Sequence, residues 1–391
     1  MQERASDFLI IGAGVTGSAI AYHLARQGQQ VVVVDRAGEA EAPVASWASA
    51  GGVRRQGRHR AEALLASEAI ARWPLLSDEL EADLHYRQGG NLLLAESNEE
   101  ADQLATFVRT QHTLGFSDVR LLDRQQVHEL LPALNQQIVA ASYSPADGQA
   151  DPIRTTRAFA TAARRHGARF LLHTTLMRLL LKERRVLGAA SERGPLYAGQ
   201  VILAAGAWSD ELAASAQLSL PVKTLALQML LSTPPTAQIL LPVLGAVGRS
   251  LSLKQLPDGA FLIGGGWPGD PSSDRRSVTT RSQSIAGNWQ DACAILPAVA
   301  RQQIAHAWCG LEAATIDEIP LLGPAPGLSG LTLALGFCGH GFALAPAVGH
   351  AIADQLLRGP VPELAGLDPA RITAFSLEQV EQFQGKHSSQ G

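Results

Sequence analysis

A glycine turn between two predicted strands restricts the fold of this chain more than any other feature of its sequence. The turn is Gly12-Ala13-Gly14-Val15-Thr16-Gly17, and it follows an apolar run at residues 8–11. A helix is predicted over residues 15–27, and a second apolar run at residues 31–34 ends at Asp35. Strand, turn, helix and strand in this order form a βαβ unit, which predicts a parallel sheet.

Each glycine of this turn has its own physical role in binding a dinucleotide. Gly12 permits the tight turn, and Gly14 lets the backbone approach a pyrophosphate. Gly17 lets the helix pack closely on the strand, and the helix start offers unpaired N–H groups to the phosphates. Asp35 lies about 20 residues further on, where an acid accepts hydrogen bonds from a ribose hydroxyl. The unit predicts a dinucleotide but does not distinguish FAD from NAD.

Composition and charge narrow the class of protein. With 391 residues, 46% of them hydrophobic, the chain is long enough for two domains with buried cores. A formal net charge of -4 gives no basic surface for nucleic acid. Cys293, Cys309 and Cys338 lack the CxxC spacing of a disulfide framework or a thiolate metal site. No apolar run approaches the roughly 20 residues of a membrane-spanning helix, and we expect a cytoplasmic protein without a bound metal.

The rest of the chain mixes helical and strand patterns. Strand patterns that alternate apolar and polar residues predict a second sheet with one wet face. Helices are predicted at 61–80, 99–113, 152–166 and 342–357. Strands are predicted at 91–95, 119–122, 201–204, 222–232, 250–263 and 331–335. The strand at 201–204 is expected to return to the first sheet, and Pro257-Asp258-Gly259 is expected to form a hairpin turn.

Six sequence blocks together resemble a known family. They are GAGVTG at 12–17, ASWASAGGVRR at 45–55, DGQADPIRTTRAFATAA at 147–163, LAAGAWS at 203–209, WCGLEAATIDEIPLLGPAPG at 308–327 and GFCGHGFALAPAVG at 336–349. In this order they resemble the FAD-dependent amino-acid oxidases, a family that includes D-amino acid oxidase, glycine oxidase and sarcosine oxidase. The last two blocks look most like the beta chains of opine oxidases, hydrogen cyanide synthase and D-hydroxyproline dehydrogenases, which usually work in hetero-oligomers.

The resemblance implies an α/β fold with two domains. A Rossmann-like FAD-binding domain would be assembled from residues 1–80, 145–215 and 310–391. A mixed-sheet α+β substrate domain would come from residues 81–144 and 216–309. The implied partners are a small-molecule amino acid or amine and either alpha- and gamma-type subunits or further copies of the chain.

The implied cofactor is non-covalent FAD. By similarity, it would be held by the glycine turn, the loop at 46–52, the turn after residue 203 and the start of the last long helix. The expected contacts are Gly12, Gly14, Val15, Thr16, Gly17, Asp35, Arg36, Ser46, Ser49, Ala50, Gly51, Gly52, Ala205, Gly206, Trp208, Gly310, Leu311, Gly339, His340, Gly341 and Phe342. Cys309 lies near the cysteine that links flavin in monomeric sarcosine oxidases, but the surrounding residues differ, and a free, buried thiol is expected.

The resemblance implies oxidation of the C–N bond of an amino acid or an N-substituted or cyclic amino acid, such as sarcosine, glycine, a proline or an opine. A hydride equivalent would pass from Cα to flavin N5, and the imine product would hydrolyse. Two alternatives remain. One is an FAD-dependent dehydrogenase of a 2-hydroxy acid or a polyol phosphate, and the other is an electron-transfer subunit that needs partner chains.

The substrate residues depart from the family pattern. Glycine oxidases carry arginines that bind the substrate carboxylate at positions aligned with Glu312 and Gly339, and neither is present here. Arg55, with Arg54 second, is the predicted clamp, because this pair aligns near the clamp of sarcosine oxidase and follows the loop at 46–52. A guanidinium fork suits a carboxylate, and the alternative is a solvated surface pair. Glu312 would recognise a cationic or amino group or would pair with an arginine.

Two further side chains have competing interpretations. His340 is either a satisfied buried histidine or a flavin contact. Lys254 would sit over the flavin and assist oxygen chemistry if it matched a lysine of sarcosine oxidase. Because that alignment is poor, a plain surface lysine is predicted instead.

Overall fold

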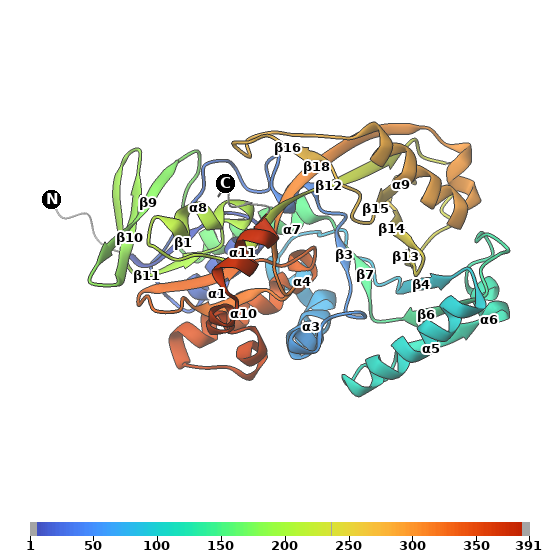
Figure 1. Ribbon diagram of the computed structural model, residues 1–391, viewed down its shortest axis with the longest axis horizontal. Coiled ribbons are helices and arrows are strands. Elements are labelled where there is room, and N and C mark those ends of the chain that lie inside the picture. The colour runs from blue at the N-terminus through green and yellow to red at the C-terminus, as the bar shows by residue number, and fades with distance from the viewer. Residues whose placement is uncertain (1–5, 236, 385–391) are drawn as a thin grey trace.

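The computed structural model describes residues 6–235 and 237–384 and contains two large sheets (Figure 1). In the first, β1 (Ser6–Ile11) pairs in parallel with β2 (Val31–Val34) on one side and β11 (Gly194–Leu203) on the other. The strand order is β19 (Leu321–Pro324), β20 (Leu331–Leu335), β11, β1, β2 and β8 (Arg169–Leu171). The predicted βαβ unit and the return of the chain at 201–204 are both confirmed.

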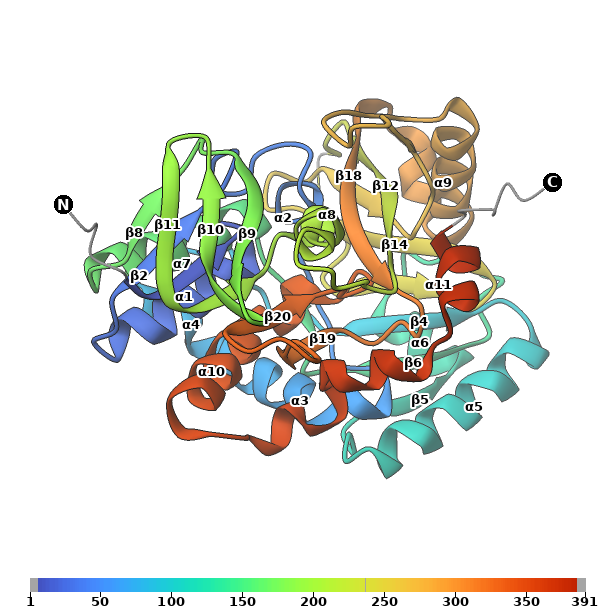
Figure 2. The same ribbon diagram turned by 60° about the vertical axis from the view of Figure 1, so that its left-hand side comes forward.

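Helices cover one face of this sheet, and a β-meander covers the other (Figure 2). On the helical face, α1 (Val15–Arg26) packs between α7 (Pro152–Arg165) and α10 (Gly341–Arg358). The close packing is possible because both helices carry small residues where they meet. Ala19 of α1 lies so close to Gly349 of α10 that a Cβ on Gly349 would collide with it. On the opposite face, β9 (Leu176–Lys182), β10 (Arg185–Ser191) and β11 pair in antiparallel order. A separate apolar core lies between these strands and the sheet.

The second sheet is mixed, as predicted. Its strands are antiparallel except where β13 pairs in parallel with β4, and α9 (Ser282–Ile295) covers one face. The order is β18 (Ile304–Thr315), β12 (Val222–Ser232), β15 (Phe261–Gly264), β14 (Arg249–Gln255), β13 (Val243–Ala246), β4 (Asn91–Ala95), β6 (Ala140–Ser144) and β5 (Arg120–Asp123).

Most predicted elements form within one or two residues of their expected ends, but the strand expected at 201–204 begins at Gly194, and one predicted helix is broken. The stretch at 61–80 is helical throughout but is divided into α3 (Ala63–Arg72), a 3-10 turn containing Pro74, and α4 (Leu76–Leu80). Proline lacks the N–H that a continuous helix needs, which accounts for the break. The strand pattern at 250–263 forms the hairpin β14–β15, and the hairpin turn predicted at Pro257-Asp258-Gly259 is confirmed.

Backbone contacts join the two sheets close to the first helix. The amide of Leu311 on β18 donates to the carbonyl of Pro43 at 2.8 Å, and Gly310 lies against Ala48 so closely that a Cβ would collide with it. Because β18 belongs wholly to the second sheet, the predicted domain boundary at residue 310 lies inside a strand. The domain division otherwise stays a prediction. Within the described residues, no helix has the length and apolar character that crossing a membrane requires.

Candidate active site

A cavity of about 1040 Å³ lies between the two sheets. Its wall begins at the glycine turn, runs along the loop at 44–52, and reaches strands β4, β12, β13 and β18 of the second sheet. The carboxyl ends of parallel strands are where α/β proteins place their ligands, and β1, β2, β11 and β20 all end at this cavity.

The glycine turn has the conformation that a dinucleotide site needs. Gly12 has a φ of +114°, and a Cβ on Gly12 would collide with the carbonyl of Ala204. The amide of Ala13 donates to the Asp35 carboxylate at 2.7 Å, which ties the turn to the end of β2. Burial raises the pKa of Asp35 above its ordinary value. Gly17 lies outside the cavity wall, and its lack of a side chain lets α1 pack against the carbonyl of Gly12.

The loop at 45–52 forms the next part of the wall. Ser46, in the short helix α2 (Ala45–Ala48), accepts a hydrogen bond from the amide of Val15 at 2.9 Å. Ser49 accepts one from Gly51 at 3.0 Å. Gly51 itself does not line the cavity, because its positive φ of +69° turns it toward Ala150 and Pro152. Its predicted cofactor role is therefore that of shaping the loop.

One end of the cavity is closed by an aromatic and cationic pair. The Arg36 guanidinium stacks over the ring of Trp208, 4.0 Å from its centroid, and both side chains line the cavity. The Trp208 Nε1 atom is buried and has no hydrogen-bond partner among the described residues. A buried N–H without an acceptor is costly, so it indicates a polar group that the bound cofactor would supply.

At the other end, the start of α10 faces the cavity. The wall there includes Gly339, His340, Gly341 and Phe342. His340 meets the buried carboxylate of Glu62 with its Nδ1 atom, 3.2 Å away. Burial and the charge of Arg58 lower the pKa of His340 to about 4, so the ring is neutral at pH 7. His340 is thus both a satisfied buried histidine and part of the cavity wall.

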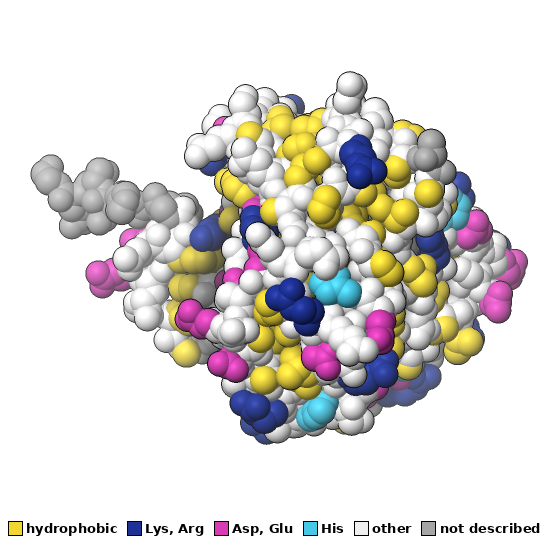
Figure 3. Space-filling view, turned by 90° about the vertical axis from the view of Figure 1, so that its right-hand side faces the viewer, with side chains coloured by type: hydrophobic (Ala, Val, Ile, Leu, Met, Phe, Trp, Pro, Cys, Tyr) yellow, Lys and Arg dark blue, Asp and Glu magenta, His cyan; other side chains and the backbone are white. Residues whose placement is uncertain are grey.

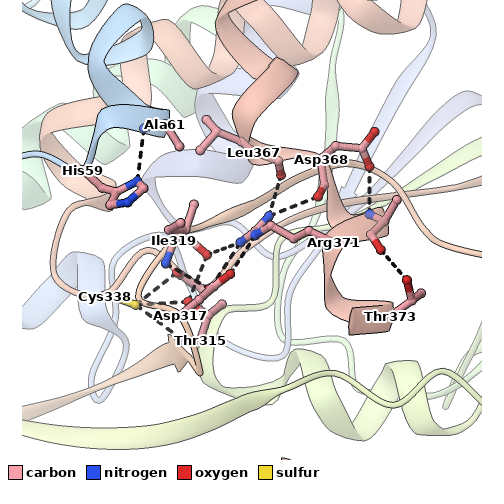
Figure 4. Close-up of polar contacts among 12 residues, drawn as sticks. His59, Ala61, Thr315, Asp317, Ile319, Cys338, Leu367, Asp368, Arg371 and Thr373 are labelled. Atoms are coloured by element: carbon pink, nitrogen blue, oxygen red, sulfur yellow. Dashed lines mark hydrogen bonds and ion pairs between the residues drawn. The ribbon is translucent and has the colours of Figure 1, made fainter. Parts of the chain in front are cut away.

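A network of hydrogen bonds fixes the turn before α10 (Figure 4). The amide of Thr315 donates to the Cys338 sulfur at 3.4 Å, and Arg371 pairs with Asp317 at 2.8 Å. These contacts hold the end of β18 beside the 336–340 turn. They therefore fix the position of Glu312 relative to the start of α10.

Glu312 lies on β18 in the cavity wall, which also includes Gly339. Burial raises the pKa of its carboxyl to about 7. Among the described residues it has no ion pair with an arginine, which removes one of its two predicted roles. Its other predicted role, recognition of a cationic or amino group, stays a prediction.

The two predicted clamp arginines face different surroundings. Arg54 lines the cavity, and no carboxylate oxygen of the described residues lies within 4.0 Å of its guanidinium. Arg55 instead pairs with Asp118 and stacks over the ring of Phe116, 4.7 Å from the centroid, and does not line the cavity. This geometry favours Arg54 over Arg55, because the charge of Arg55 is already paired with Asp118, and the identity of the clamp stays a prediction.

Two functional candidates are not predicted by the sequence. The expected surface lysine, Lys254, is only 3% exposed, and its Nζ atom lies 3.1 Å from the position of a Cβ on Gly51. Burial lowers its pKa to about 7. Arg58, 5% exposed, lines the cavity, whereas Lys254 lies outside its wall. The alternation along β14 signals that Lys254 shares a face with Ser252, a cavity residue, but no comparable local pattern marks Arg58.

The fold and the cavity define an oxidoreductase of the dinucleotide-binding class, with a Rossmann-like sheet and a second sheet that closes over the cofactor groove. The family model for "FAD dependent oxidoreductase" matches residues 7–355. The chain belongs to this family, and its cofactor is FAD. The resemblance expected from the six sequence blocks is confirmed.

Curated relatives and a solved structure extend this finding. Dimethylglycine dehydrogenase of Rattus norvegicus is 26% identical over 98% of this chain, and the chain spans 47% of that protein's length. A subunit of the opine oxidase of Rhizobium meliloti is 29% identical, covering 96% of this chain and 99% of that one. Glycine oxidase of Pseudomonas aeruginosa is 31% identical, covering 93% and 98%. The crystal structure of L-proline dehydrogenase from P. horikoshii superposes with a TM-score of 0.88, at 26% identity over 95% and 98%.

Proposed function

We propose that this enzyme oxidises the C–N bond of an amino acid, or of an N-substituted or cyclic amino acid, to an imine that then hydrolyses. The observation that carries the proposal is the Arg54 guanidinium, which lines the cavity beside the cofactor groove without a carboxylate partner among the described residues. Arg54 is partly buried, and a substrate carboxylate would pair with its charge. The four related proteins are named for glycine, dimethylglycine, proline and opine substrates, which all carry a carboxylate and an amine.

FAD, when bound non-covalently, supplies the acceptor for two electrons and the Cα hydrogen. The residues of this chain bind and orient the substrate. Arg54 holds the carboxylate, while Glu312 on the facing strand accepts a hydrogen bond from the amine. Ionised Glu312 can also accept the ammonium proton, because its pKa of about 7 lies near neutral pH. A neutral amine at a fixed distance from the carboxylate is what the oxidation requires.

The expected FAD contacts are proposed to act in two groups. The glycine turn, Asp35, Ser46 and the α1 start would bind the ADP half, with Arg36 and Trp208 beside it. The loop at 49–52, the turn at 205–206 and the start of α10 would surround the ring. A helix start aimed at the ring edge stabilises the negative charge that develops there on reduction.

An anaerobic titration of the purified holoenzyme tests the function. Sarcosine, glycine, D- and L-proline, hydroxyprolines and an opine are added separately, and the visible flavin absorbance is followed. At least one amino acid should bleach the flavin completely. Bleaching by lactate or glycerol 3-phosphate alone would instead establish the hydroxy-acid or polyol-phosphate alternative.

We also propose that the chain works with partner subunits. Two kinds of observation support this: a relative named as a subunit covers nearly the whole chain, and the substrate-domain end exposes apolar side chains, including Leu121, Leu130 and Leu241. Yellow hydrophobic atoms cover much of the upper part of that face (Figure 3). Light scattering of the chain alone and of a co-expressed complex tests the proposal. Vigorous peroxide production by an isolated monomer would contradict it.

A further inference from the structure

A second arginine shares the cavity wall with Arg54. Arg58 is 5% exposed and lines the cavity, and its Nε atom donates to the backbone carbonyl of Arg54 at 3.0 Å. Its Nη1 atom has no hydrogen-bond acceptor among the described residues. Burial, together with the neighbouring charge of Arg54, lowers the pKa of Arg58 to about 9, which leaves the guanidinium mostly charged at pH 7.

The acidic groups nearest to Arg58 are engaged elsewhere. Glu62 accepts a hydrogen bond from the amide of His59 at 3.3 Å and meets His340 at 3.2 Å. Asp147 accepts hydrogen bonds from the backbone amides of Arg55 and Gln56, at 2.9 and 3.4 Å. Neither carboxylate has an oxygen within 4.0 Å of the Arg58 guanidinium. A buried arginine left in this state is destabilising unless a ligand pairs with it.

One carboxylate is too small to satisfy both arginines. Two guanidinium groups offer ten N–H donors, and only the Arg58 Nε donor is used by the protein side chains and backbone described here. A carboxylate provides two oxygens, which a single guanidinium fork already engages side by side. The unused N–H donors of Arg54 and Arg58 are therefore sufficient to bind two anionic groups.

We propose that Arg58 binds a second acidic group of the substrate, so that the preferred substrates are N-substituted amino acids that carry two carboxylates. The inference rests on the proposed function in one respect, because it assumes that the first carboxylate binds Arg54. In this arrangement Arg58 is a specificity-determining residue: it selects among substrates by the group that they carry on nitrogen.

A pair of non-oxidisable ligands separates this inference from the reaction itself. Oxydiacetate and methoxyacetate have the same ether core, and only oxydiacetate has a second carboxylate. Each is titrated into the FAD-loaded enzyme while the perturbation of the flavin spectrum is recorded. The wild-type enzyme should bind oxydiacetate about 10- to 100-fold more tightly than methoxyacetate, as a charge-assisted hydrogen-bonded pair would give. A ratio near one in the wild-type enzyme overturns the proposal without recourse to any variant.

Variants then assign the preference to one side chain. Arg58→Met should bring the ratio close to one while it changes methoxyacetate binding by less than about threefold, and Arg58→Lys should keep part of the preference. Arg60→Met is the matched control, because Arg60 is an exposed arginine two residues away. If Arg58→Met weakens both ligands equally, Arg58 supports Arg54 or the cofactor and the proposal is wrong. If Arg58→Met does not fold, the preference of Arg58→Lys for oxydiacetate over methoxyacetate tests the proposal instead. An unchanged preference together with weaker methoxyacetate binding would also overturn the proposal.

Substrate oxidation provides the second readout. Iminodiacetate and sarcosine share a glycine unit and differ by one carboxylate on the nitrogen substituent. The wild-type enzyme should be reduced faster by iminodiacetate at low concentrations, and Arg58→Met should remove that advantage. If no amine reduces the flavin but the ligand ratio holds, the proposed function fails and the second acidic subsite stands. If amines react but the ratio is one, only the subsite is wrong.

Discussion

The dinucleotide end and the substrate end of the cavity are built in different ways. At the dinucleotide end, the backbone forms the site: Gly12 has a positive φ, and the amide of Ala13 is fixed by Asp35. At the substrate end, charged side chains form it: Arg54, Arg58 and Glu312 line a wall between two sheets. A backbone site tolerates almost no change at its glycines, whereas a side-chain site can change specificity by single substitutions without loss of the fold.

The largest effect is expected at the backbone end. Gly12→Ala places a Cβ against the carbonyl of Ala204 in a conformation that L-residues rarely adopt. The combined strain and overlap should cost roughly 3 kcal/mol or more of stability and abolish FAD binding. The flavin-to-protein absorbance ratio measures FAD binding, and the thermal midpoint measures stability. Gly28→Asn is the control, because Gly28 also has a positive φ but no neighbouring atom within 4 Å, and it should bind FAD normally. A stable, yellow Gly12→Ala protein would remove the contrast between the two ends.

The next effect tests which of two adjacent arginines binds substrate. Arg54→Met should lower kcat/KM for a carboxylated substrate by about 100-fold or more, because a charge-assisted pair is lost. Arg55→Met should alter kcat/KM by less than about threefold, since its partly exposed pair with Asp118 contributes at most about 1 kcal/mol to stability. Steady-state kinetics of the two variants side by side give the answer. A larger loss in Arg55→Met would reverse the assignment.

A smaller effect concerns the buried lysine between the two ends. Lys254 is buried beside Gly51, which favours the less expected interpretation, in which it assists oxygen chemistry as a lysine does in sarcosine oxidase. Lys254→Met should slow reoxidation of the reduced enzyme by oxygen by about 10- to 100-fold, as removal of one preorganised charge would do. Anaerobic reduction by substrate should change little. Stopped-flow traces of both half-reactions decide, and equal slowing of the two would indicate a structural role.

The smallest effect is a pH-dependent change in stability. Burial raises the pKa of Glu312 from 4.5 to about 7. At a pH between these two pKa values, Glu312 has lost its proton in the unfolded chain but keeps it in the folded protein. The contribution of Glu312 to stability therefore decreases as pH rises through this range. The free energy of unfolding of Glu312→Gln, relative to that of the wild type, should therefore increase by on the order of 1–3 kcal/mol between about pH 5 and pH 8. Thermal midpoints of both proteins across this range measure it. A constant difference would mean that Glu312 is ionised throughout.

The contrast between the two ends also explains what the sequence could predict. The glycine turn, and strands such as Val31–Val34 and Leu331–Leu335, follow from local chemistry, and the structure has them where they are expected. The clamp could not be chosen in this way, because Arg54 and Arg55 are adjacent and chemically identical. Only the tertiary position of Asp118 withdraws one of them from the cavity.

The other positions that the sequence does not predict have the same physical origin. The alternation along β14 places Lys254 on one face with Ser252, but only the tertiary structure shows that Gly51 lies over this face and buries the lysine. Arg58 has no local signal because part of its surroundings, such as His340, comes from a segment that is distant in sequence. Polar side chains reveal their roles only when the whole cavity wall is in place.

The most direct test of the account is a crystal structure of the holoenzyme with pyrrole-2-carboxylate, a planar, unreactive analogue of an amino acid. We predict FAD in the groove, with its phosphates at the start of α1, and the ligand carboxylate at about 2.7–2.9 Å from the Arg54 guanidinium. A groove filled by side chains or by a nicotinamide nucleotide, or a carboxylate bound by Arg55, would contradict it.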